Sequence, residues 1–258
     1  MRIEAEFMRR IAAAAAAETL PRFRQAGLVS DNKHAAGFDP VTEADRGAEQ
    51  AIRAVIREAF PGHGIIGEEF GSENAERRHV WVIDPIDGTR SFISGVPLWG
   101  TLVGLTEDGD AVAGMMSQPF TGELFRADDE GSWYDGPGGT RRLATRPTRV
   151  VADATLCTTT PALFTGAKRA PYDRLEAAVR LARYGTDCYA YAMLAAGNID
   201  LVVETELQPY DIVALVPIIE RAGGVITTWD GGPAEKAGDI VAAATPELHA
   251  AALEMLNG

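Results

Sequence analysis

The chain has 258 residues, 46% of them hydrophobic, which is enough for a substantial core in one large domain or two small ones. Its formal net charge of −13 and sequence pI near 4.8 argue against nucleic acid or an anionic membrane surface as the main partner. Only two cysteines occur, without a CxxC pattern, and no apolar run reaches the roughly 20 residues of a membrane span, so a cytoplasmic globular protein is expected.

Two helices are expected at the start of the chain. Residues 3 to about 26 are rich in alanine until Pro21 kinks or ends the pattern. Residues 27–41 are polar and broken by glycine and proline, which indicates a loop; its Lys33 is a candidate to close over a site. Thr42 and Asp45 form a capping signature for a helix that extends to Phe60. Taken alone, Asp45 complements the dipole of this helix.

The stretch from Trp81 to Arg90 is the most informative part of the chain. The apolar residues that open it predict a buried strand, and Asp84 is expected at the carboxyl end of that strand. Pro85 and the pair Asp87-Gly88 then turn the chain out of the sheet. Two carboxylates and free amides therefore lie near one another. An ordinary surface turn would have the same local pattern, so neighbouring acids decide between the two interpretations.

Further acidic residues stand at the ends of other predicted elements. Glu68 follows a short strand around residues 65–66, and Asp211 falls in the first turn of a helix that begins at Pro209. Carboxylates brought together repel one another unless cations compensate them or their pKa values rise. Divalent cations such as Mg²⁺ prefer oxygen ligands, and the amides of Gly88 and Thr89 can hold a phosphate. Metal-assisted hydrolysis of a phosphomonoester uses more of these acids than the alternative, glycoside hydrolysis by two carboxylates.

The rest of the chain predicts sheets covered by helices in layers, an α+β fold. Residues 98–125 form a meander, and 128–149 form an exposed connection with a strand at 132–134, which divides one domain (1–258) into halves of roughly 1–147 and 148–258. Four further strands are expected, near residues 154–158, 201–204, 225–227 and 240–244. The remaining helices are expected at 172–183, from 209 to about 222 with a kink at Pro217, and from 246 to the end.

Three motifs together resemble the inositol monophosphatase superfamily: Gly67-Glu68-Glu69, Asp84-Pro-Ile-Asp-Gly-Thr89, and Pro209-Tyr-Asp211 continuing to Ala222-Gly-Gly224. The resemblance covers nearly the whole chain. It implies a layered αβαβα sugar-phosphatase fold, dependence on Mg²⁺, sensitivity to Li⁺ and a homodimer.

The same resemblance assigns roles to individual residues. It implies that Glu68, Asp84, the carbonyl of Ile86, Asp87 and Asp211 ligate the metals. It also implies that Thr89, paired with Asp45 and aided by Glu68, orients the attacking water. Asp45 thereby gains a role that the residues alone do not give it.

A finer pattern indicates the substrate. The run from Asp87 through Arg90-Ser91 to Leu102, with Tyr184-Gly-Thr-Asp187-Cys-Tyr-Ala-Tyr191, is most similar to the histidinol-phosphate phosphatases. Inositol monophosphatases usually have Thr-Asn in place of Arg90-Ser91. The substrate implied is L-histidinol phosphate, in histidine biosynthesis, and Asp187 and Glu204 are expected to pair with its amine. Asp187 is equally well interpreted as a helix cap, and Arg90 either binds phosphate with Gly88 and Thr89 or faces solvent.

Other functions remain open on the sequence. An inositol-1-phosphate or 3′-phosphoadenosine 5′-phosphate phosphatase of the same superfamily is the enzymatic alternative. A non-catalytic regulatory member would be expected to lack a ligand acid, and the chain lacks none of them.

Overall fold

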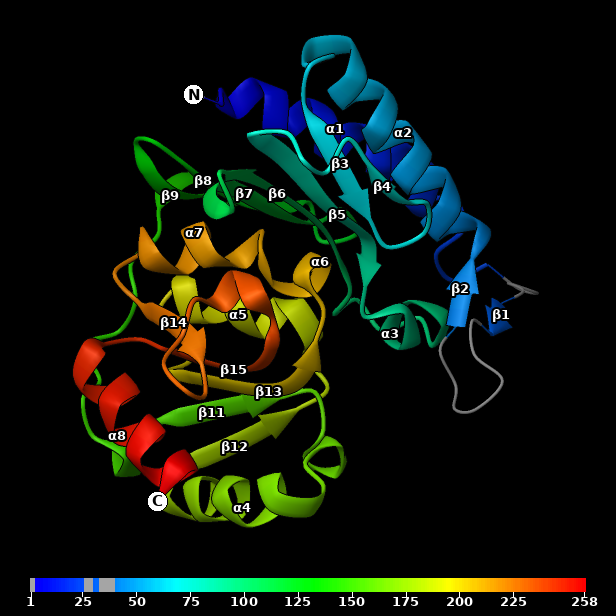
Figure 1. Cartoon of the computed structure of the whole chain (residues 1–258). Helices are drawn as coiled ribbons and strands as arrows, with labels where there is room; N and C mark the ends of the chain where they lie inside the picture. Colours follow the sequence, from blue (N-terminus) through cyan, green and yellow to red (C-terminus); the bar gives the residue numbers. More distant parts are fainter. Residues whose placement is uncertain (1–2, 26–29, 33–39) are drawn as a thin grey trace.

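The computed structural model describes residues 3–25, 30–32 and 40–258, so the loop that contains Lys33 lies outside the described residues (Figure 1). The helices are α1 (Ala5–Thr19), α2 (Glu43–Ala59), α3 (Thr89–Ile93), α4 (Arg169–Ala178), α5 (Asp187–Ala195), α6 (Pro209–Ile212), α7 (Leu215–Glu220) and α8 (Pro246–Asn257). The strands of the first half are β1 (Ser30–Asn32), β2 (Pro40–Thr42), β3 (Gly64–Gly67), β4 (Gly71–Glu73), β5 (His79–Asp87), β6 (Gly100–Glu107), β7 (Asp110–Gln118), β8 (Glu123–Asp128), β9 (Gly131–Gly136) and β10 (Gly139–Arg142). Those of the second half are β11 (Thr155–Thr158), β12 (Leu181–Tyr184), β13 (Leu201–Leu207), β14 (Val225–Thr228) and β15 (Gly238–Ala243).

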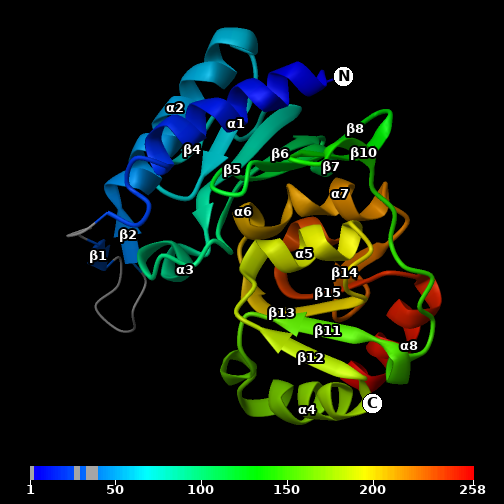
Figure 2. The ribbon, with the colours of Figure 1, turned by 180° about the vertical axis from the view of Figure 1, so that it is seen from behind.

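The elements form five layers, which confirms the predicted αβαβα fold (Figures 1 and 2). Helices α1 and α2 cover the outer face of an eight-stranded sheet with the order β10-β9-β8-β7-β6-β5-β3-β4. Helices α5, α6 and α7 lie between this sheet and a five-stranded sheet with the order β12-β11-β13-β15-β14. Helices α4 and α8 cover the other face of the five-stranded sheet. Among the described residues, no helix combines the length and the apolar character needed to cross a bilayer.

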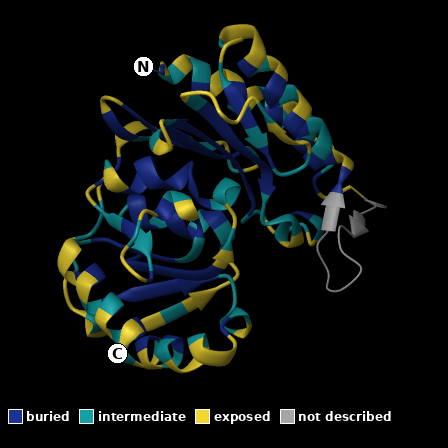
Figure 3. Ribbon diagram, in the orientation of Figure 1, coloured by how far each residue is buried: buried dark blue, intermediate teal, exposed yellow. Residues whose placement is uncertain are grey.

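The buried residues concentrate in the two sheets and in the helices between them (Figure 3). The cluster around α5 and α7 includes Leu102 and Phe125 from the eight-stranded sheet and Val202 and Ile240 from the five-stranded sheet. Because both halves contribute apolar side chains to this cluster, burying it requires that they fold against each other. The shared core supports our proposal that the chain forms a single domain.

The helix predicted from residue 209 to 222 is interrupted, because α6 ends at Ile212 and α7 begins only at Leu215. Pro217 has no N–H to donate to the carbonyl four residues earlier, at Val213, which is where the break falls. Gly104 and Gly114 are paired across β6 and β7 beneath this junction. A Cβ at Gly114 would lie 2.0 Å from the carbonyl oxygen of Ala214, so only glycine permits this approach.

Several predicted boundaries were wrong. Strand β5 continues beyond Asp84 to Asp87, because a register shift against β6 between these residues lets the chain bend without leaving the sheet. The stretch 128–149 contains two strands, β9 and β10, which extend the eight-stranded sheet as a hairpin. The helix expected at 172–183 ends at Ala178, and β12 follows it on the edge of the second sheet.

Candidate metal and phosphate site

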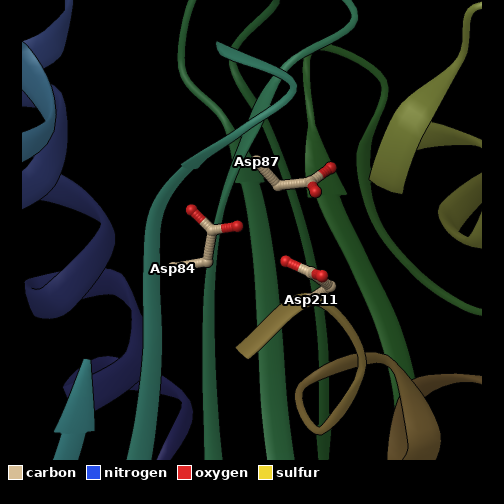
Figure 4. Close-up of side chains that lie close together, drawn as sticks. All are labelled: Asp84, Asp87 and Asp211. Atoms are coloured by element: carbon tan, nitrogen blue, oxygen red, sulfur yellow. The ribbon is translucent and has the colours of Figure 1, made fainter. Parts of the chain in front are cut away.

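Three aspartates from two elements converge between the halves of the molecule (Figure 4). Asp84 and Asp87 come from the end of β5, and Asp211 comes from the first turn of α6. One carboxylate oxygen of each lies within 4.8 Å of the others. Burial raises the pKa of Asp84 well above its ordinary value of 3.8, and the charges of Glu68, Asp87 and Asp211 add to the effect. The sequence prediction that these acids meet in one place is thus confirmed for these three.

The backbone at the irregularity in β5 fixes the two aspartates of that strand. Oδ1 of Asp84 accepts a 2.9 Å hydrogen bond from the amide of Ile86. The carbonyl of Pro85 accepts a 2.8 Å hydrogen bond from the hydroxyl of Thr101 on β6, and the carbonyl of Ile86 accepts one of 3.1 Å from Thr89. These bonds pair polar groups where the register shift interrupts the regular ladder, and they hold the backbone between Asp84 and Asp87.

Burial and neighbouring acids also raise the pKa of Asp87 well above 3.8, chiefly through burial and then through the charges of Asp187 and Asp211. The hydrogen bond from the amide of Cys188 opposes this rise. Burial therefore disfavours the ionised form of both Asp84 and Asp87, and a nearby positive charge would favour it.

Glu68 and Asp45 lie beside this group of aspartates. Glu68 begins the turn between β3 and β4, and its amide donates a 3.1 Å hydrogen bond to the carbonyl of Ile83 in β5. Asp45 is buried in the first turn of α2, where Thr42 caps the helix as predicted. Burial raises the pKa of Asp45 from 3.8 to about 6, and the charge of Glu68 contributes to that rise. Residues 42 to 68 thus bring two more carboxylates toward β5.

The expected pair of Thr89 and Asp45 is not tested by the hydrogen bonds of the structure. The hydroxyl of Thr89 donates to the carbonyl of Ile86. The carboxylate of Asp45 accepts from the amide and the hydroxyl of Thr42, at 2.7 and 2.5 Å. A joint role for Thr89 and Asp45 on a water molecule stays a prediction.

The donor set fits a divalent cation. Every candidate ligand is an oxygen atom of a carboxylate or a carbonyl, which is the preference of a hard cation such as Mg²⁺. The charge of Asp211 raises the pKa of both Asp84 and Asp87, so the ionised forms of these neighbouring carboxylates disfavour one another. A bound cation would remove this repulsion and keep all three groups ionised.

A pocket of about 230 Å³ opens over these residues. Its lining consists of Glu68, Asp84, Ile86, Asp87, Gly88, Thr89, Arg90, Thr159, Leu163, Asp187, Glu204, Leu207 and Asp211. All the predicted metal, phosphate and substrate residues are among them, and Asp45 is the one predicted site residue outside the lining. A larger cavity of about 650 Å³ beside α6 is lined by residues outside the predicted site, including Ile66, Val82 and Arg77, so we place the chemistry in the smaller pocket.

Gly88 and Asp187 approach each other closely in the lining of the pocket. Gly88 has φ +80°, and a Cβ there would lie 2.9 Å from Oδ2 of Asp187. The same Oδ2 accepts a 2.8 Å hydrogen bond from the hydroxyl of Ser91. Asp187 is the first residue of α5, and the N-cap position before it is occupied by Thr186, so the interpretation of Asp187 as the helix cap was wrong. Arg90 is exposed, and its charge opposes the rise that burial causes in the pKa of Asp187.

Glu204 lies on β13 and is 2% exposed. Its Oε1 accepts hydrogen bonds from the amide and the hydroxyl of Thr159, at 2.6 and 3.1 Å, and burial raises its pKa from 4.5 to about 7. The hydroxyl of Thr159 also lies 3.3 Å from Oδ1 of Asp187. Sequence reasoning missed Thr159, because no pattern in the chain distinguishes this hydroxyl residue from ordinary loop residues. It noted Ser91 only as part of the Arg90-Ser91 pair and did not predict its hydrogen bond to Asp187.

Comparisons with known proteins agree on one family. The profile of the Inositol monophosphatase family matches residues 4–257. The chain is 41% identical over 238 residues to the bifunctional phosphatase IMPL2, chloroplastic, of Arabidopsis thaliana, which covers 85% of this chain and 66%, just under two thirds, of that protein. It is 34% identical to a histidinol-phosphatase of Streptomyces coelicolor, over 96% of this chain and 94% of the relative. The solved structure of an inositol monophosphatase from Zymomonas mobilis superposes with a TM-score of 0.87 at 39% identity, covering 98% of this chain and 97% of the other.

Proposed function

Since the chain belongs to the inositol monophosphatase family, we propose that it is an Mg²⁺-dependent phosphomonoesterase whose substrate is L-histidinol phosphate. The products would be L-histidinol and inorganic phosphate. The observation that carries the choice of substrate is a pair of carboxylates, the half-buried Asp187 and the buried Glu204, which line the same pocket as the aspartate cluster.

We propose that Glu68, Asp84, Asp87, Asp211 and the carbonyl of Ile86 hold the metal. Divalent cations bound there would supply positive charge for the phosphate oxygens and lower the pKa of a water molecule. The protein itself would bind the phosphate through the amides of Gly88 and Thr89, with Arg90 at the exposed rim of the pocket. Asp45 and Thr89, with Glu68, would then orient the attacking water and receive its proton.

The part of the substrate beyond the phosphate would lie against Asp187 and Glu204. Histidinol phosphate carries an ammonium group, and a cation between these two carboxylates replaces their repulsion with charge-assisted hydrogen bonds. Such a partner also explains why burying Glu204 is tolerable although its pKa rises to about 7. A polyol such as inositol offers hydroxyl groups but no compensating charge.

The residues 90 and 91 support the same choice. The Ser91 hydroxyl orients Asp187 through the hydrogen bond to Oδ2, and Ser91 belongs to the pair that replaces the Thr-Asn of inositol monophosphatases. A substitution that distinguishes the two groups of enzymes is therefore in direct contact with the proposed amine ligand.

The decisive experiment compares kcat/KM of the purified protein for L-histidinol phosphate, inositol 1-phosphate and 3′-phosphoadenosine 5′-phosphate, with Mg²⁺ and with EDTA. We expect histidinol phosphate to be preferred by at least about tenfold and activity to require Mg²⁺, since one charge-assisted hydrogen bond contributes about 1.5–3 kcal/mol. A higher kcat/KM for inositol 1-phosphate would refute the substrate while keeping the reaction. Equal activity in EDTA would refute the role of the metal.

We also propose a homodimer in the cytoplasm. Phe70 and Phe120 are each 46% exposed, and burying apolar surfaces of this kind against a second copy would be favourable. Multi-angle light scattering should give a mass near twice 27.5 kDa. A monomeric mass at micromolar concentration would refute the dimer.

A further inference from the structure

A buried ion pair on α2 holds the loop that contains Glu68. Glu49 is completely buried, one helical turn after Asp45. Its Oε2 accepts a 2.7 Å hydrogen bond from the amide of Glu69, and its Oε1 accepts one of 3.3 Å from the amide of Phe70. Oε1 also accepts a 2.7 Å hydrogen bond from Nε of Arg53, which is 4% exposed. One carboxylate therefore satisfies two backbone amides and a guanidinium group.

Arg53 extends the same network around the turn between β3 and β4. Its guanidinium donates to the carbonyl of Gly71, the first residue of β4, and lies 3.6 Å from the carboxylate of Glu73. Glu49 and Arg53 thus both bind the backbone that follows Glu68, at residues 69–71. The pair lies outside the pocket, because neither Glu49 nor Arg53 lines it.

Gly67 completes this arrangement. A Cβ at Gly67 would lie 2.0 Å from Oε1 of Glu49 and 2.8 Å from a nitrogen of Arg53. These two side chains pack directly against the backbone that precedes Glu68, so a larger residue at position 67 would displace them. The glycine of the Gly67-Glu68-Glu69 motif is thus required by the buried pair.

The consequence is that Glu68 is fixed on both sides. Its own amide donates to the carbonyl of Ile83, which precedes Asp84, and the next amide donates to Glu49. A glutamate in an exposed turn would otherwise lose considerable conformational entropy on joining the aspartate cluster. The buried carboxylate of Glu49 accepts hydrogen bonds from the amides of Glu69 and Phe70, and such charge-assisted bonds strongly restrict the conformation of the turn.

We propose that Glu49 is a positioning residue that sets the place of the Glu68 carboxylate in the metal site and thereby raises the affinity of the site for divalent cations. The inference rests on the proposed function, since it takes Glu68 as a metal ligand. Glu49 does not line the substrate pocket, and its described hydrogen bonds to the loop go to the backbone amides of residues 69 and 70.

The substitution Glu49→Gln tests this role. Glutamine keeps the shape of the side chain but has only one acceptor oxygen. Its NH₂ group would face an N–H group that now donates to Glu49. It therefore loses at least one of the three hydrogen bonds. Glu49→Asp keeps a negative charge next to Arg53, but its side chain is one methylene shorter, so the carboxylate lies farther from the loop. This variant replaces Glu49→Gln in the experiment if the glutamine variant does not fold.

Mn²⁺ is the probe, with its dissociation constant measured by electron paramagnetic resonance on folded protein without substrate. Partners that orient metal ligands typically contribute about 10–100-fold to affinity, so we expect the Kd for Mn²⁺ to rise by about tenfold or more in Glu49→Gln and by less in Glu49→Asp. The concentration of Mg²⁺ for half-maximal activity should rise in parallel.

Ile56→Val is the matched control, because Ile56 is fully buried on the same helix and belongs to the core cluster instead of the loop network. It should lower the melting temperature slightly, because it removes one buried methyl group from the core, while the Kd for Mn²⁺ stays within about twofold of the original chain. If Glu49→Gln or its replacement Glu49→Asp is destabilised but binds Mn²⁺ as the original chain does, Glu49 is only structural and the inference is wrong. If the original chain itself binds no Mn²⁺, the proposed metal site fails, and the inference fails with it.

Discussion

The backbone amide of Cys188, at the start of α5, donates a 2.7 Å hydrogen bond to Oδ2 of Asp87, at the end of β5. This bond joins the two halves of the chain at the aspartate cluster. The amide belongs to the first turn of a helix, where the macrodipole favours a negative charge. The second half of the chain therefore stabilises the ionised form of Asp87, which the neighbouring acids disfavour.

The substitution Asp87→Asn should separate the two effects of this carboxylate. Asparagine can still accept from the amide of Cys188, but it removes one negative charge from the site. We expect kcat to fall by at least about 100-fold, because the loss of a metal ligand removes several kcal/mol of transition-state stabilisation. In EDTA the melting temperature should rise, since burial and the charges of Asp187 and Asp211 disfavour the ionised carboxylate.

Asp110→Asn is the control for this experiment, because it removes the same charge from an exposed residue at the start of β7. Its kcat and melting temperature should stay near those of the original chain. Unchanged turnover in Asp87→Asn would refute the assignment of Asp87 as a metal ligand.

The acids of the cluster could be found from the sequence because each stands at the end of an element with a clear apolar pattern. Asp84 follows a buried run, and Asp211 follows the helix-starting Pro209. The continuation of β5 to Asp87 could not be found, because a register shift depends on the partner strand β6. Thr159 was missed for a related reason: its contacts with Asp187 and Glu204 join residues from three elements.

Other differences follow from tertiary contacts that local patterns do not contain. The edge strand β12 is exposed at Leu181 and Tyr184, so it lacks the buried pattern of a central strand and was interpreted as helix. The hairpin of β9 and β10 is polar, and its alternation is weak. The layers themselves were predictable, because they depend on the strong apolar periodicity of the core elements and on the family resemblance.

The stability of the protein without divalent cations should fall as the pH rises from about 4 to 7. Burial raises the pKa of Asp45 from 3.8 to about 6 and that of Glu204 from 4.5 to about 7. Between the unfolded and the folded pKa the folded state binds more protons than the unfolded state, so the free energy of unfolding decreases with rising pH. Urea unfolding in EDTA at pH 5 and pH 8 measures this difference.

Glu204→Gln should remove the contribution of Glu204 to this pH dependence. A shift of that size corresponds to about 3 kcal/mol, so at pH 8 the variant should be more stable than the original chain by up to about that amount. Glutamine can still accept from the amide of Thr159. The exposed substitution Glu254→Gln on α8 is the control and should change stability little. A Glu204→Gln variant that is less stable at pH 8 would contradict the assignment.

The contact between the sheet and the junction of α6 with α7 gives a further prediction. Gly114→Ala places a Cβ 2.0 Å from the carbonyl oxygen of Ala214, and this backbone has to move. Overpacking of this kind typically costs about 1–3 kcal/mol. Because Asp211 precedes Ala214 by three residues, we also expect weaker binding of Mn²⁺. Gly62→Ala, with no atom within 4 Å of its added Cβ, should leave both quantities nearly unchanged. Normal metal affinity in a destabilised Gly114→Ala would show that the junction does not set the place of Asp211.

Asp187→Asn tests how the pocket recognises an amine. Asp187 has φ +42°, a conformation that asparagine tolerates, and the amide oxygen can still accept from Ser91, so the change removes mainly the charge. We expect KM for L-histidinol phosphate to rise by about 10–100-fold, the worth of one charge-assisted hydrogen bond, and KM for inositol 1-phosphate to change little. Ser91→Ala keeps the charge but loses the orienting hydrogen bond, so its effect on histidinol phosphate should be smaller. An equal rise in KM for both substrates would mean that Asp187 supports Gly88 and the phosphate, and that the amine is bound elsewhere.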